Sequence, residues 1–161
     1  MNLLILGDIM GASGRKALHN KLPNLIKHNK IDFVIVNGEN ASDDGKGITK
    51  EITEEFFKVG VDVITSGNHI WDKKETTDFI EKENRLLRPA NLANGSPGRG
   101  HQIYLSKDRN FKVGVINLMG NVFMRKTEDA FKTAKEISNK MKLKKDVDFI
   151  VVDFHGEITS E

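Results

Sequence analysis

Short apolar runs that end in polar, glycine-containing motifs recur along the chain. The clearest run covers residues 33–36 and stops within one residue at a carboxylate set between two amides. A short run of β-branched and apolar residues is typical of a strand that is buried on both faces. The four motifs that follow such runs are Gly7-Asp8, Asn37-Gly38-Glu39-Asn40, Ser66-Gly67-Asn68-His69 and His155-Gly156-Glu157.

The segments between these strands have helical character. We expect helices over about residues 14–29, 49–59, 73–83 and 128–142, with Pro23 interrupting the first, Thr49 capping the second and Thr127 capping the last. Strands separated by helices form βαβ units with a parallel sheet. The pattern therefore predicts an α/β fold in which the four motifs meet at one sheet edge, where open α/β sheets bind their ligands.

A different organisation begins after residue 90. Residues 94–100 contain three glycines and a proline and are predicted to form a loop. Residues 102–105 and 111–118 are predicted to be two strands joined by a longer turn. Because hairpin strands are antiparallel, we expect a second or mixed sheet to begin here.

Composition narrows the classes of function. The 161 residues suffice for one domain with a core, and a net charge of +2 gives no reason to expect bulk nucleic-acid binding. The absence of cysteine excludes disulfides, thiolate zinc sites and cysteine nucleophiles. Neither a basic n-region nor a cleavage site comes before the first strand, so we expect no signal peptide, and the apolar runs are too short to cross a membrane. We therefore expect a cytoplasmic protein.

The glycine-rich segment 7–15 does not match a phosphate-binding loop. Its glycines stand at positions 7, 11 and 14, which fits neither the dinucleotide-binding fingerprint nor the P-loop. Arg15 is predicted to be a solvated residue of the first helical turn, although a phosphate contact is the alternative.

The residues expected at the sheet edge suggest metal chemistry. Asp8, Glu39, Asn68 and His155 offer oxygen and nitrogen ligands without thiolate, a set that suits manganese, iron or zinc. Two ions about 3.5–4 Å apart can clamp both oxygens of an in-line phosphoryl displacement. Glu39 is the candidate to bridge them, and His69 could protonate the leaving oxygen. The alternative is that these side chains are ordinary loop starters.

The residues of these motifs resemble those of a known family. Gly7-Asp8-Ile9-Met10-Gly11, Asn37-Gly38-Glu39-Asn40, Gly67-Asn68-His69-Ile70-Trp71-Asp72 and Arg88-Pro89-Ala90-Asn91 are similar to the calcineurin-like metallophosphoesterases, and in particular to their bacterial YmdB-type branch. The resemblance implies a four-layer α/β/β/α sandwich with two metal ions, usually iron or manganese, and zinc as a further choice. It also implies hydrolysis of cyclic nucleotides, especially 2′,3′-cyclic ones, by a metal-bound hydroxide.

The same resemblance implies a role for each residue that matches a motif. Asp8, Glu39, Asn68 and His155 would be metal ligands, with Glu39 bridging. His69 would be the catalytic acid, and Asn40 would lie beside the metals or the substrate. The expected partner is a small cyclic nucleotide or another phosphodiester, and a homo-oligomer is left open.

The sequence departs from the broad superfamily at three places. Met10 and Glu39 stand where a histidine and an aspartate are usual, and both replacements fit the YmdB-type branch. The last motif, Gly-x-His-x-His, is absent. We therefore expect residues 1–161 to be one metallophosphoesterase domain that lacks its C-terminal part. The competing hypothesis is a non-catalytic nucleotide- or RNA-binding module on the same fold.

Overall fold

The computed structural model describes all of residues 1–161 and contains six strands and four helices. The strands are β1 (Leu3–Leu6), β2 (Phe33–Asn37), β3 (Val63–Thr65), β4 (His101–Leu105), β5 (Lys112–Met119) and β6 (Phe149–His155). The helices are α1 (Gly11–Asn29), α2 (Lys50–Lys58), α3 (Thr76–Phe79) and α4 (Ala130–Lys140).

The first three strands form a parallel sheet in the order β1-β2-β3. Every residue of the central strand β2 is buried, because it has a neighbour on each edge and packed side chains on each face. This explains why its sequence is apolar without alternation.

The last three strands form a second sheet in the order β4-β5-β6. The predicted hairpin is confirmed, since β4 and β5 are antiparallel. Strand β6 runs parallel to β5, from the pair Val113↔Phe149 to the pair Met119↔His155. The prediction that β6 shares a sheet with the first three strands is therefore wrong. Helix α4 returns the chain beside β5, so the crossover extends the second sheet instead.

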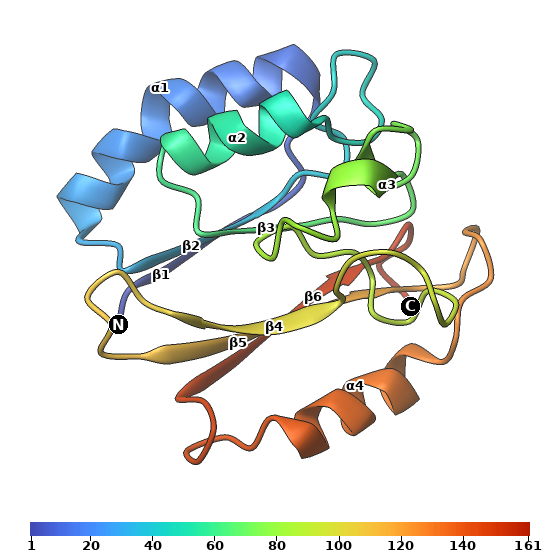
Figure 1. Cartoon of the computed structure of the whole chain (residues 1–161). Helices are drawn as coiled ribbons and strands as arrows, with labels where there is room; N and C mark the ends of the chain where they lie inside the picture. The colour runs from blue at the N-terminus through green and yellow to red at the C-terminus, as the bar shows by residue number, and fades with distance from the viewer.

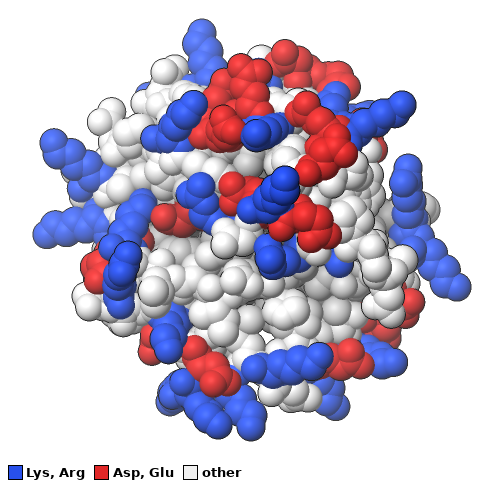
Figure 2. Space-filling model, in the orientation of Figure 1, with Lys and Arg blue, Asp and Glu red and all other residues white.

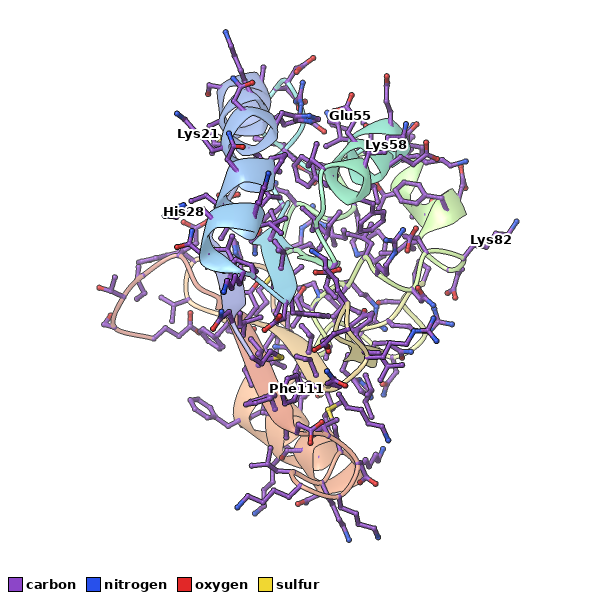
Figure 3. The ribbon with its side chains drawn as sticks, turned by 90° about the vertical axis from the view of Figure 1, so that its left-hand side faces the viewer. Lys21, His28, Glu55, Lys58, Lys82 and Phe111 are labelled. Atoms are coloured by element: carbon purple, nitrogen blue, oxygen red, sulfur yellow. The ribbon has the colours of Figure 1, made fainter.

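Helices and sheets are stacked in layers (Figure 1). Helices α1 and α2 cover the outer face of the first sheet, the two sheets face each other, and α4 covers the second sheet. At the start of β5 and β6, Phe111 packs edge-on against Phe149 with ring centroids 5.7 Å apart (Figure 3). All strands except β4 run in one direction and end on the right of Figure 1. The four motifs therefore reach one side of the molecule from two sheets.

Two helices differ from the sequence-based expectation. Helix α1 begins at Gly11 and passes Pro23 without a break, because Leu18 and Leu22 are buried against the first sheet and hold it in place. Helix α3 is only four residues long, and turns replace the rest of the expected helix. Its sequence supplies too few buried apolar residues to anchor a longer helix.

One of the two predicted helix caps is confirmed. The Thr49 hydroxyl accepts a hydrogen bond from Ile52 N at 3.2 Å and caps α2. The prediction of Thr127 for α4 is wrong, because Asp129 caps this helix by accepting from Lys132 N at 2.9 Å. The Thr127 hydroxyl is instead engaged with the side chains of two asparagines.

The surface carries charges of both signs. Figure 2 shows lysine and arginine interspersed with aspartate and glutamate over the face on view, without a stripe of one sign. None of the helices has the length and apolar content that crossing a membrane requires.

Candidate active site

A sharp turn after β2 places Glu39 at the centre of the site. The Asn37 side chain accepts a hydrogen bond from Glu39 N at 3.0 Å, and Gly38 N donates to Thr65 O at 2.9 Å. These two bonds fix the turn against β3. The Glu39 side chain is completely buried, which is costly for a carboxylate unless cations or hydrogen-bond donors surround it.

Glu39, Asn68 and His155 converge at one point. Glu39 Oε1 accepts a hydrogen bond from His69 N at 3.0 Å, and Oε2 lies 2.6 Å from His155 Nε2. The same imidazole nitrogen is 3.1 Å from Asn68 Oδ1. Although the imidazole is close to Glu39 Oε2, this oxygen accepts no hydrogen bond of ordinary geometry.

The charges around the imidazole favour its protonated form. Burial lowers the pKa of His155, but the Glu39 carboxylate, with smaller contributions from Asp153 and Asp8, outweighs it, and the pKa lies above the ordinary 6.5. A cation bound here would replace that proton, since a histidine ligand must be neutral.

Gly67 is what allows this convergence. A Cβ atom at Gly67 would lie 2.0 Å from Glu39 Oε2 and 2.3 Å from His155 Cδ2. Both side chains therefore pack directly on the glycine backbone, and any other residue would push them apart.

The structure places the predicted acid beside a second carboxylate. His69 Nδ1 lies 2.7 Å from Asp72 Oδ2, and both side chains are partly exposed. The sequence analysis named Asp72 only as part of a family motif and assigned it no role. The spacing of three residues after His69 is the signal that could have singled it out.

The two remaining predicted residues form a separate pair. Asp8 is exposed and accepts a hydrogen bond from Asn40 Nδ2 at 2.6 Å. The other side-chain atom of this amide, Asn40 Oδ1, is buried without a partner. No three histidine or acidic side chains converge as a group that could hold a metal ion.

The donor chemistry nevertheless fits a metal ion. Asn40 Oδ1 is a buried acceptor without a hydrogen-bond donor, and Glu39 Oε2 is a buried acceptor whose only close neighbour is the His155 imidazole. A cation would satisfy acceptors of this kind. Glu39 Oε2, Asn68 Oδ1 and His155 Nε2 make a mixed oxygen and nitrogen set, which suits manganese, iron or zinc.

The YmdB-like protein family matches residues 4–161, almost the whole chain. The chain belongs to this family. It is 42% identical over 161 residues to the 2′,3′-cyclic-nucleotide 2′-phosphodiesterase of Bacillus subtilis, a match that covers 100% of this chain and 59% of that protein.

Two solved structures share the fold of this YmdB-like chain. One is a protein from Thermus thermophilus, with a TM-score of 0.89 and 32% identity over 100% of this chain and 60% of its own. The other is a phosphatase from Mycoplasma pneumoniae, with a TM-score of 0.86 and 35% identity over 98% of this chain and 56% of its own. The chain spans less than two thirds of the length of these relatives.

Two buried amides to which the sequence analysis assigned no role join the two sheets of the YmdB-like chain. Asn117 of β5 donates to Ser66 O and accepts from Ser66 N, both at 2.9 Å. Asn37 donates to Asp153 of β6 at 3.0 Å. These contacts fix the backbone just before Asn68 and His155. An asparagine inside the apolar run of β5 is the signal that could have revealed the first link.

Arg15 is not the solvated residue that the sequence predicts. Its guanidinium donates to Ala41 O at 2.5 Å and pairs with Asp43 at 2.6 Å. Lys73 pairs with Asp44 at 2.6 Å from the other side. The polar segment after Asn40 is therefore tied to both α1 and the segment that follows His69.

Proposed function

We propose that the protein is a metal-dependent phosphodiesterase that hydrolyses cyclic nucleotides, with 2′,3′-cyclic nucleotides as the first candidates. The observation that carries this proposal is the convergence of Asn68 and His155 on the completely buried Glu39 carboxylate, in a chain of the YmdB-like family. The B. subtilis relative, which is named for this activity, supports the choice of substrate.

We further propose that residues 1–161 are the larger part of one metallophosphoesterase domain. The stacking of helices, two sheets and helix supports a four-layer sandwich. The greater length of the relatives supports a further part, and the missing Gly-x-His-x-His motif is the reason to place it after residue 161.

Glu39, Asn68 and His155 would hold one ion, and Asp8 would serve a second ion with Glu39 bridging. Iron and manganese are the first candidates and zinc the next, because the ligands are oxygen and nitrogen. When bound, the ions would supply positive charge to the phosphoryl group and lower the pKa of the attacking water.

The residues of the chain would orient the ester and move one proton. Asp72 accepts from His69 Nδ1 and would thereby stabilise the imidazolium, in which both ring nitrogens carry a proton, so that Nε2 could give its proton to the leaving oxygen. Asn40 would contact the substrate or support Asp8, with which it is hydrogen-bonded.

Replacement of the acid tests the mechanism. In this chain extended by the segment that follows the matched region in the B. subtilis relative, His69→Ala should lower turnover of 2′,3′-cyclic AMP by about 10²–10⁴-fold with the metals still bound. The loss should be smaller for nitrophenyl esters, because nitrophenolate leaves without protonation.

His28→Ala is the matched control, since His28 is an exposed histidine of α1 that takes no part in the site. Equal losses for both esters would contradict the acid role of His69. Nucleotide binding without any hydrolysis by the metal-loaded extended protein would contradict the proposed function and support the non-catalytic module.

A further inference from the structure

The loop between β5 and α4, residues 120–129, starts at the candidate site. Gly120 N donates a hydrogen bond to the carbonyl oxygen of His155 at 2.9 Å. In Figure 1 this orange loop projects at the right, on the side where the parallel strands end. The loop therefore stands beside the place where the phosphate would be hydrolysed.

Hydrogen bonds hold the loop at both ends. At its start, Glu161 Oε1 accepts from Asn121 N at 2.5 Å and from Val122 N at 3.2 Å. At its end, Asn121 Oδ1 accepts from the backbone and the hydroxyl of Thr127 at 2.6 and 3.0 Å. The tip between them is thus presented from a fixed base.

Phe123 at the tip is the most exposed large apolar side chain of the protein, at 86%. Its φ of +60° lies in the left-handed region, which is unusual for a bulky residue. Neither burial nor an ordinary turn preference accounts for a phenylalanine here. Two exposed cations, Arg125 and Lys126, follow it within three residues.

We propose that Phe123 stacks on the nucleobase of the nucleotide substrate, while Arg125 and Lys126 attract its phosphate. This inference rests on the proposed function. A nucleotide contains a flat aromatic base and an anionic phosphate. The exposed ring of Phe123 can contact the base, and the two cations that follow it can attract the phosphate. Stacking accepts any base, so the loop would select nucleotides over other phosphodiesters without selecting among bases.

The test compares two ligands that share the cyclic phosphate. The dissociation constants of 2′,3′-cyclic AMP and of base-free ribose 2,3-cyclic phosphate are measured by titration calorimetry or NMR for residues 1–161 with Mn²⁺. Phe123→Ala should weaken binding of the nucleotide by about 5- to 100-fold, the range expected for one lost base–aromatic stack. The dissociation constant of the base-free ligand should stay unchanged. The Phe123→Trp variant should bind the nucleotide as tightly as the unaltered protein does.

The control is Phe131→Ala, because Phe131 is also strongly exposed, at 80%, but lies on α4. This variant should bind both ligands normally. Equal effects of Phe123→Ala on both ligands, or no effect on the nucleotide, would overturn the stacking role and leave the proposed function intact. If the unaltered protein bound neither ligand, the stacking role would be overturned, whereas the proposed function would still be decided by hydrolysis in the extended protein.

Discussion

At the scale of single residues, much of the site follows from where each side chain stands after a strand. Glu39, Asn68 and His155 were expected to meet because strands that run in one direction deliver their ends to one side. Asp8 was expected with them, yet it pairs with Asn40 instead. The order of residues along the chain predicts on which side of the molecule a side chain lies. Its exact position within the site depends on the turn after each strand, which the sequence pattern does not predict.

Gly67 shows how a residue without a side chain shapes the site. We expect Gly67→Ala to weaken Mn²⁺ binding by about 10- to 100-fold, the usual effect of disturbing the groups that orient ligands. The added methyl group would displace the Glu39 carboxylate and the His155 ring together. Titration of the protein against a fluorescent chelator measures the change.

Gly7→Ala is the matched control. Gly7 also precedes a predicted ligand, but a Cβ atom there meets nothing within 4 Å. Unchanged metal affinity in Gly67→Ala would show that the ion does not bind between Glu39 and His155.

At the scale of elements, the strands themselves were easier to predict than the neighbouring strands with which they pair. The apolar runs mark β2 and β6 equally well, but nothing in the run of β6 says which sheet it joins. That choice depends on α4, which packs on the second sheet and returns the chain beside β5. Long-range packing also explains why α1 tolerates Pro23, since its buried face outweighs one missing hydrogen bond.

The link between the sheets gives a prediction at this scale. Asn117→Ala should lower the free energy of unfolding by about 2–5 kcal/mol, because it leaves the amide and carbonyl of Ser66 without the Asn117 bonds in a buried place. Urea unfolding followed by circular dichroism measures the difference. Asn139→Ala on the exposed surface of α4 should change it by less than about 0.5 kcal/mol. A loss for Asn117→Ala as small as that of the control would mean that water replaces the link.

At the scale of the whole molecule, apolar side chains are exposed on β1 and β6, each of which is one outer strand of its sheet. Ile5 of β1 is 53% exposed, and Val152 and Phe154 of β6 are 48% and 40% exposed. Strand edges of this kind favour pairing with a further strand.

The number of metal ions bound gives a second prediction at this scale. Glu39, Asn68 and His155 surround one point, whereas Asp8 stands apart with Asn40, so the chain offers a second ion too few ligands. We therefore expect residues 1–161 to bind at most one metal ion tightly and to hydrolyse 2′,3′-cyclic AMP very weakly. Extending the chain with the segment that follows the matched region in the B. subtilis relative should restore both the second ion and turnover. Elemental analysis and hydrolysis assays on the two proteins provide the comparison. Two tightly bound ions and full activity in the 161-residue protein would show that its own residues complete the site, and the role assigned to the additional segment would then be wrong.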